Sequence, residues 1–296
     1  MPTPQDRPLP SRVRRVPRRR GFRRVVAILL VMFAMDLAWR AGAFAHPARA
    51  SDRTLAAGAL APLSGPPIVT RAQTESELTK LIELGYPVAC GGGTKPLVAL
   101  TFDDGPGPYT KATLRILQSE GAHATFFIVA KELVDWPNLG DEPKAEARVA
   151  AIGDHTYDHV GLAGLAQAEL DHQVGDAKTL IEQRSGVPVR LFRPPFGEHD
   201  ASVDHEVQGL GMVEVLWSVD SGDSTGARWQ TELRTVEAGL RPGAIVLMHE
   251  NRGPTLKILP QLLQDIRARG LHAVTVPELL TADPPSLAQL KSGTCQ

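Results

Sequence analysis

Apolar and polar positions repeat along residues 96–281 with two different periods. Short runs of consecutive apolar or β-branched residues predict buried strands, and apolar residues three or four positions apart predict helices that bury one face. We expect strands at 97–102, 124–129, 189–192, 212–219, 244–248 and 271–276. We expect helices at 74–84, 110–120, 169–185, 203–210 and 258–269.

The alternation of strands and helices, joined by short connections, predicts a parallel sheet with right-handed crossovers. About seven such units in fewer than 200 residues is typical of a barrel. The expected fold class is therefore α/β, a distorted, partly open (β/α)7-type barrel. In such barrels the chemistry takes place on the loops that follow the carboxyl ends of the strands.

Composition divides the chain into four parts. Residues 1–50 are expected to be a signal peptide or an N-terminal membrane anchor. Residues 51–95 begin with an Ala-, Pro-, Ser- and Gly-rich stretch and are expected to be a linker and N-terminal extension. Residues 96–281 form the expected catalytic domain, and residues 282–296 a C-terminal tail.

The N-terminal segment has the pattern of an export signal. Eight arginines between positions 12 and 24 precede an apolar run of eleven residues, 25–35. A bilayer span takes about 20 residues, so this run suits the core of a signal peptide better. Small residues spaced for cleavage follow at 43–45 and 48–50. We expect a secreted, cell-wall-associated protein, with an uncleaved membrane anchor as the alternative.

Charge and cysteine content narrow the class of partner. Residues 1–50 hold eleven of the 32 Lys and Arg, so residues 51–296 carry 21 basic and 31 acidic groups, a net charge of about −10. Phosphate contacts need clustered basic residues, which argues against nucleic-acid binding. The two cysteines, Cys90 and Cys295, are expected to form a disulfide in an oxidising compartment.

Two adjacent acids end the first strand, in Val98-Ala-Leu-Thr-Phe-Asp-Asp-Gly-Pro-Gly-Pro108. Successive strand side chains point to opposite faces, but a Gly-Pro turn could bring Asp103 and Asp104 to one cavity. The alternative is ordinary turn chemistry, since Asp before Gly and Pro is common in turns. The rest of the chain must decide between the two interpretations.

Further polar clusters are expected just after strands. His155 and His159 are four positions apart, the spacing of one face of a helical turn and of a common pair of zinc ligands. Arg193 precedes a Pro-Pro pair, two acids follow the strand predicted at 212–219, and His249 ends another strand. Each cluster alone has an ordinary structural explanation. The two histidines could be surface residues, the Pro-Pro pair could simply end a strand, and His249 could be a hydrogen-bonded histidine of the core. Their shared placement favours a common site.

An aspartate together with His155 and His159 supplies three metal ligands and leaves one position open, which is the arrangement of a catalytic zinc site. The other aspartate would then be free to transfer protons. The two adjacent acids thus divide into a metal ligand and a base.

Five motifs in order resemble those of the polysaccharide deacetylases, the NodB-like proteins of carbohydrate esterase family 4. They are Thr101-Phe-Asp-Asp-Gly105, His155-Thr-Tyr-Asp-His159, Arg193-Pro-Pro-Phe196, Asp220-Ser-Gly-Asp223 and Leu247-Met-His249. The resemblance covers about residues 96–281. It implies a distorted barrel of β/α units and a metal-dependent hydrolase that releases acetate from N-acetylated sugars of peptidoglycan or chitin type.

The resemblance also implies a role for each motif residue. Asp104, His155 and His159 would hold a divalent metal, zinc or cobalt as a substitute. Asp103 would be the general base, paired with Arg193, and His249 the general acid, oriented by Asp223. The backbone N–H of Phe196 would bind the oxyanion, and Leu247 would line the pocket for the acetyl methyl.

Two departures from the family pattern concern the substrate pocket. Ser224 stands where the family often has Trp, and Phe196 where Tyr is usual. The first removes a pocket wall, which Trp217 or Trp229 could replace. The expected partner is an N-acetylated polysaccharide or oligosaccharide bound by a monomer, with no nucleic acid and with membrane contact only through the N-terminal segment. The alternatives are an O-acetyl esterase on acetylated xylan and a binding module that has lost turnover.

Overall fold

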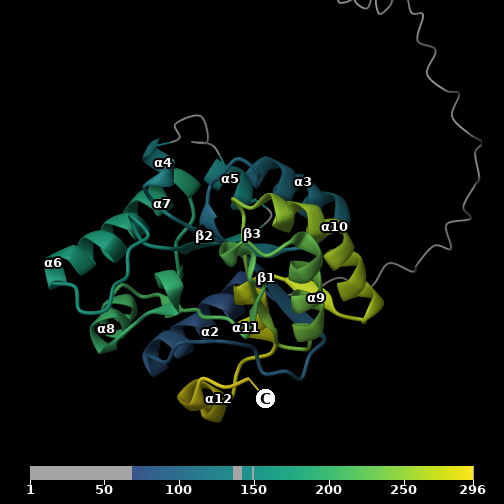
Figure 1. Cartoon of the computed structure of the whole chain (residues 1–296). Coiled ribbons are helices and arrows are strands. Elements are labelled where there is room, and N and C mark those ends of the chain that lie inside the picture. Colours follow the sequence, from purple (N-terminus) through teal and green to yellow (C-terminus); the bar gives the residue numbers. More distant parts are fainter. Residues whose placement is uncertain (1–68, 136–141, 149, 296) are drawn as a thin grey trace, which may run out of the picture. The chain divides into compact units, whose positions relative to one another are not determined.

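A computed structural model describes residues 69–135, 142–148 and 150–295, and shows a curled sheet of parallel strands with helices packed around it (Figure 1). The sheet order is β5-β4-β3-β2-β1-β7-β6, and β8 pairs with the start of β1. The strands are β1 (Leu97–Gly105), β2 (Ala124–Ile128), β3 (Ala150–Asp154), β4 (Leu191–Phe192), β5 (Val213–Glu214), β6 (Val219–Asp220), β7 (Ile245–His249) and β8 (His272–Val274). The predicted fold class, a distorted and partly open barrel, is confirmed.

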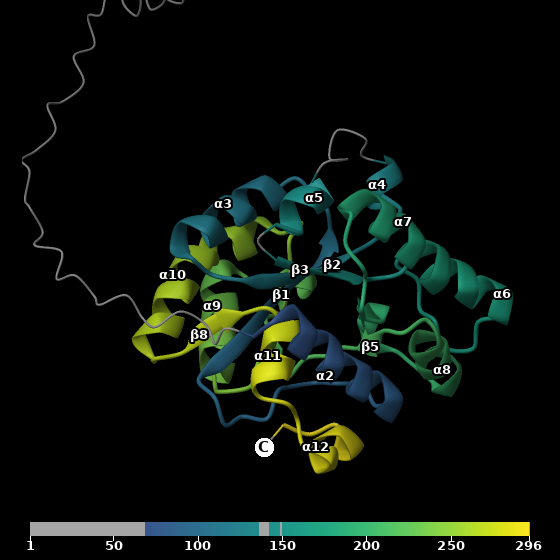
Figure 2. The same cartoon turned by 180° about the vertical axis from the view of Figure 1, so that it is seen from behind.

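The helices cover the outside of the sheet and one end of it (Figure 2). They are α2 (Arg71–Leu84), α3 (Thr110–Glu120), α4 (Glu132–Asp135), α5 (Glu142–Glu146), α6 (Gln167–Leu170), α7 (Ala177–Ser185), α8 (Ala201–Gly209), α9 (Trp229–Gly239), α10 (Gly253–Ala268), α11 (Val276–Ala282) and α12 (Leu287–Ser292). A π-helical turn, Asp171–Asp176, joins α6 to α7, so the helix predicted at 169–185 is present with a local irregularity. None of the helices in the described ranges is long and apolar enough to cross a bilayer.

Alternation along β1 separates two hydrophobic cores. Leu100 and Phe102 pack outward into a cluster with residues of α3, α7 and α10. Leu97 and Ala99 point to the other face, where the barrel interior contains Leu81 of α2 and residues of α11. The two helices therefore fill the end of the barrel at which β1 begins, and the opposite end, where the strands finish, remains for polar residues.

The strand predicted at 212–219 is wrong as a single element. Its first part is β5 and its last part is β6, which lie at opposite edges of the sheet. Between these edges the barrel is open, and backbone groups of residues 215 and 216 pair with residues outside the two strands. Val88 forms a parallel bridge with Val215, and the Arg193 guanidinium donates to the carbonyl oxygens of Val215 and Leu216, each at 3.0 Å. A buried side chain thus replaces the missing strand pairing.

Strand β3 was not predicted, because its residues Ala150-Ala-Ile-Gly-Asp154 carry little apolar bulk. The small residues are a packing requirement. A Cβ on Gly153 would lie 2.4 Å from the ring of Phe127 on the adjacent strand β2. Helices α4, α5, α9, α11 and α12 were also not predicted.

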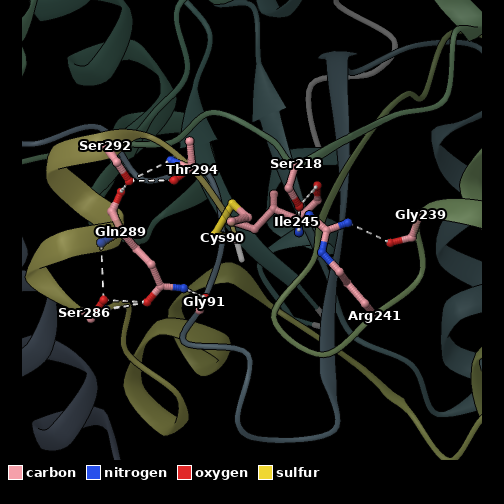
Figure 3. Close-up of a disulfide and its surroundings, with 11 residues drawn as sticks. Cys90, Gly91, Ser218, Gly239, Arg241, Ile245, Ser286, Gln289, Ser292 and Thr294 are labelled. Carbon is pink, nitrogen blue, oxygen red and sulfur yellow. Dashed lines mark hydrogen bonds between the residues drawn. A yellow bond between two sulfur atoms is a disulfide. The ribbon is translucent and has the colours of Figure 1, made fainter.

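Cys90 and Cys295 form the predicted disulfide, across a sequence separation of 205 residues. Figure 3 shows the bridge beside α12, where the Gln289 side chain donates to the carbonyl of Gly91. The backbone of Cys90 also forms an isolated antiparallel β-bridge with Ala244, next to β7. Closing so long a loop stabilises a domain by up to about 5 kcal/mol through the reduced entropy of the unfolded chain. The bridge therefore fastens the end of the described chain to the barrel.

The predictions for residues 1–50, and the part of the predicted segment 51–95 that precedes residue 69, lie outside the described residues. The described part of that segment, from residue 69, contains α2 and the chain that leads to Cys90. The four-part division stays a prediction.

Candidate active site

The polar clusters predicted after separate strands meet at one end of the barrel. Asp103 on β1 pairs in register with His249 on β7. On the other side of β1, β2 pairs with β3, whose last residue Asp154 directly precedes His155. Asp154 in turn pairs with Phe192 of β4, and Arg193 follows. The parallel arrangement therefore assembles the site from strand ends that are far apart in the sequence.

The two adjacent acids reach one cavity because the backbone turns between them. Asp103 continues the strand, whereas Asp104 has a φ of +69°, in the left-handed region. As a result the Nε2 atom of His155 lies 3.7 Å from a carboxylate oxygen of Asp103 and 3.7 Å from one of Asp104. The site interpretation of the Asp-Asp pair is thus favoured over a surface turn.

Asp104, His155 and His159 form a group whose ligand atoms all lie within 4.8 Å of one another. The Oδ1 atom of Asp104 is buried without a hydrogen-bond partner and lies 3.3 Å from Nε2 of His159. The Nδ1 atom of His155 is 2.7 Å from the carbonyl oxygen of Arg193 and donates to it, so its Nε2 presents a lone pair. Burial lowers the pKa of His155 to about 3, which keeps the imidazole neutral. These features fit a divalent metal ion.

The predicted helical turn at His155–His159 is wrong, since these residues form a loop after β3. The Asp154 carboxylate accepts from the Thr156 N–H at 2.8 Å, and the Thr156 hydroxyl accepts from the His159 N–H at 3.0 Å. Side-chain hydrogen bonds, and not helical spacing, bring the two histidines together.

Backbone strain is concentrated at this site. The described residues include four non-glycine residues with positive φ, which are Asp104, Thr156, His159 and Phe196. Such conformations cost of order 1–3 kcal/mol each and persist where the surrounding structure requires them. All four belong to the segments that carry the predicted metal ligands and the predicted oxyanion donor.

Asp103 and Arg193 form the predicted buried pair, with 2.8 Å between Nη1 and Oδ1. Arg193 is 0% exposed, and its guanidinium lies over the ring of Phe127, 4.1 Å from the centroid. The same Nη1 also donates to the Thr101 hydroxyl at 2.7 Å. Burial raises the pKa of Asp103, and the positive charge of Arg193 opposes that rise. Arg193 therefore holds Oδ1 of Asp103 in place, while Oδ2 lies near His155.

Asp223 and His249 form a second buried pair, at 2.7 Å between Oδ1 and Nδ1. The other oxygen of Asp223 accepts from the His249 backbone N–H at 2.7 Å and from the Thr255 hydroxyl at 2.6 Å. Burial opposes a charge on His249, but the hydrogen bond to Asp223 and the Asp103 carboxylate raise its pKa to about 9. His249 is therefore protonated at neutral pH, with Nε2 as its free donor.

The predicted pocket residues surround this centre. Phe196 is 64% exposed, and its ring meets that of His159 edge to face, with 5.0 Å between centroids. Leu247 is buried on β7, two residues before His249 and so on the same face of the sheet. Trp217 lies near Arg193 and would contact a Cβ on Gly197, whereas Trp229 packs against Lys257 of α10. Of the two tryptophans, Trp217 is the one beside the site.

Sequence reasoning missed three residues that support the site. Thr101, inside the first motif, links Arg193 to the carbonyl oxygen of Val246. Asn251 approaches Asp104, with 3.4 Å between Nδ2 and Oδ2, and Thr255 binds Asp223. Threonine and asparagine in such positions look like ordinary cap or turn residues, so no sequence signal separates them from those roles.

Comparison with known proteins agrees with this geometry. The pattern of the polysaccharide deacetylase family matches residues 91–215. A chitooligosaccharide deacetylase of Azorhizobium caulinodans is 31% identical over 196 residues, which are 61% of this chain and 92% of that protein. This chain belongs to the polysaccharide deacetylase family. Membership supports a hydrolase that acts on N-acetylated glycans.

Two further matches describe the range of this deacetylase family. A peptidoglycan-N-acetylglucosamine deacetylase of Bacillus cereus is 32% identical over 190 residues, 62% of this chain and 88% of that protein. The crystal structure of a family 4 carbohydrate esterase pseudoenzyme from Bacillus anthracis superimposes with a TM-score of 0.62 at 27% identity, over 68% of this chain and 70% of that one. The fold is thus shared by active and inactive members, and the site residues must be considered individually.

Proposed function

We propose that this polysaccharide deacetylase is a secreted, metal-dependent enzyme that hydrolyses the acetamide of N-acetylated sugars in peptidoglycan or chitin-type glycans. One observation carries the proposal. Asp103 and His249 are register neighbours on adjacent strands, Asp103 lies beside His155 of the candidate ligands, and each of the two is held by a partner of opposite charge. A base and an acid at one amide group are what hydrolysis of that group requires.

Asp104, His155 and His159 would hold the metal, with zinc favoured by two imidazoles and one carboxylate. Such an ion supplies Lewis acidity for the amide carbonyl and lowers the pKa of water. The fit rests on the buried, unpartnered Oδ1 of Asp104 and on the neutral His155. Cobalt is the expected substitute.

The chain's own residues would carry the protons. Asp103, held by Arg193, takes a proton from the attacking water. His249, held by Asp223, donates its Nε2 proton to the leaving amine. The Phe196 N–H would stabilise the oxyanion, and Leu247 would contact the acetyl methyl. The charge of Arg193 favours the ionised form of Asp103, and the hydrogen bond to Asp223 favours the protonated form of His249.

The substrate class is an N-acetylated glycan, consistent with the two named relatives, which are chitooligosaccharide and peptidoglycan deacetylases. The chain contains three Tyr and four Trp, so few aromatic rings are available to stack on sugars. A short or polar binding groove is therefore expected, next to the exposed Phe196 ring that contacts His159.

Acetate release tests the function. The purified protein, dialysed against chelator and resupplied with zinc or cobalt, is expected to release acetate from chitooligosaccharides or peptidoglycan. His155→Ala should abolish turnover and lower bound metal, whereas His205→Ala, an exposed histidine on α8, should change neither. Release from acetylated xylan alone would establish an O-acetyl esterase. Metal binding without acetate from any substrate would establish a binding module and implicate Ser224.

Export is the second part of the proposal, and it rests on the arginine-rich N-terminus, the following apolar run and the disulfide. Expression of the full chain in a bacterial host should yield a mature protein whose N-terminus lies shortly after residue 45 or residue 50. N-terminal sequencing of the exported protein measures this. An intact N-terminus on protein extracted from membranes would instead establish the anchored form.

A further inference from the structure

A second cluster of potential metal ligands lies outside the active site. His199 is in the loop before α8, Asp204 is in the first turns of α8, and Glu214 is on β5. The Nδ1 atom of His199 is 2.7 Å from Oδ1 of Asp204 and 3.4 Å from Oε1 of Glu214. All three ligand atoms lie within 4.8 Å of one another. The cluster therefore joins a helix to the edge strand at the open side of the barrel.

Glu214 is the unusual member. It is 5% exposed, and neither carboxylate oxygen has a hydrogen-bond partner. Among the described residues, the ion-pair partners of Asp204 and Glu214 are confined to His199. A buried carboxylate without a partner costs several kcal/mol in general. Binding of a cation by these three side chains would therefore stabilise this part of the protein.

An imidazolium on His199 does not remove this imbalance. Its single Nδ1–H is directed at Asp204 at 2.7 Å, which leaves the two oxygens of Glu214 without a donor. A cation bound by Nδ1 and by one oxygen of each acid would satisfy all three groups at once. A small pocket lined in part by Asp204, Glu214 and residues of α2 lies beside the cluster.

We propose that His199, Asp204 and Glu214 form a second divalent-metal site, separate from the Asp104 site. One imidazole and two carboxylates are a ligand set for zinc or a similar transition ion, whereas calcium and magnesium prefer oxygen ligands alone. Three protein ligands leave room for water in the fourth position.

The position of the site suggests a structural role. His199 follows Phe196 by three residues, and the segment between them contains the left-handed Phe196 and Gly197. A metal at His199 would fix this segment against β5, while Asp204 would tie down α8. The bound ion would thus stabilise the edge of the barrel and the loop that carries the predicted oxyanion donor.

Zinc stoichiometry tests the proposal. The tag-free full-length protein is dialysed against a defined free zinc concentration, and bound zinc is measured by inductively coupled plasma mass spectrometry. The wild type should bind two equivalents and Glu214→Gln one. The double variant His155→Ala/His159→Ala should also bind one, and the combination of all three substitutions none. His205→Ala, one residue from Asp204, is the matched control and should keep two.

Thermal unfolding supplies a second readout that does not depend on activity. Zinc should raise the Tm of His155→Ala/His159→Ala, and this rise should disappear when Glu214→Gln is added. The zinc-free Glu214→Gln protein should unfold at the wild-type temperature or above it, because glutamine keeps the size of the side chain and carries no charge in this buried position beside Asp204.

One equivalent of zinc in both the wild type and Glu214→Gln would overturn the proposal. This inference and the proposed function fail in different ways. Zinc that survives His155→Ala/His159→Ala and is lost in Glu214→Gln would support the second site even if the active site bound none.

Discussion

Replacing His249 with glutamine is expected to lower kcat for acetate release by about 10²- to 10⁴-fold and to leave bound metal unchanged. Glutamine can still hydrogen-bond to Asp223, but it has no proton to give to a leaving amine. In the structure His249 is paired with Asp223 and does not belong to the group of three candidate ligands. Acetate release and metal content, measured on the same preparation, separate the two effects. His205→Gln is the control, and loss of metal from His249→Gln would show that its role is wrongly assigned.

The pH dependence of the wild type and of Asp223→Asn sharpens this test. With a His249 pKa of about 9, kcat should fall above pH 9 as the acid loses its proton. Asp223→Asn removes the hydrogen bond to a carboxylate, so the fall should begin at lower pH. The free energy of unfolding should change with pH in the same direction as kcat. Because the pKa of His249 is higher in the folded protein, its contribution to stability is fully present below the ordinary histidine pKa of about 6.5. That contribution is lost as the pH rises through 9, and Asp223→Asn should abolish this loss.

Replacing Arg193 with methionine is expected to destabilise the fold by about 3–5 kcal/mol, one of the largest effects of any single substitution in the chain. The change leaves Asp103 buried without its cation and removes the donors to the Val215 and Leu216 carbonyls. Urea unfolding at pH 7 measures it. Arg190→Met, three residues earlier and near the surface, is the matched control and should cost less than about 1 kcal/mol.

The double variant Asp103→Asn/Arg193→Met distinguishes charge from packing. If the buried charge of Asp103 dominates, the double variant should be more stable than Arg193→Met, because the unpaired carboxylate is gone. It should still release no acetate, since the proposed base Asp103 is replaced. A double variant as unstable as the sum of both single changes would show that the lost carbonyl contacts matter more than the ion pair.

The sequence predicted the parts of the fold in which local pattern and tertiary structure agree. The apolar runs at 97–102 and 244–248 are central parallel strands, covered on both faces, so they lack polar positions. The motif residues converge because the carboxyl ends of parallel strands share one edge. Asp103, Arg193, Asp223 and His249 form the predicted pairs, while the roles of all site residues stay predictions until activity is measured.

The parts that could not be predicted depend on partners distant in the sequence. Residues 212–219 read as one strand because nothing in their composition marks the break, which Arg193 and Val88 impose from elsewhere. The loop at His155 depends on left-handed backbone that spacing does not reveal. Glu214 reads as an ordinary strand residue, and only the packing of α8 shows that it faces His199 and Asp204.

The disulfide between Cys90 and Cys295 should keep the protein in one covalent piece after a protease cuts a surface loop between the two cysteines. Every residue placed in the active site, from Asp103 to His249, lies inside the covalent ring that this bridge closes. A single cut in any surface loop within the ring therefore opens it without releasing a fragment. Asp103 on β1 and His249 on β7, the proposed base and acid, stay in one molecule and are held by their strand pairing, so a nicked protein is expected to keep them together.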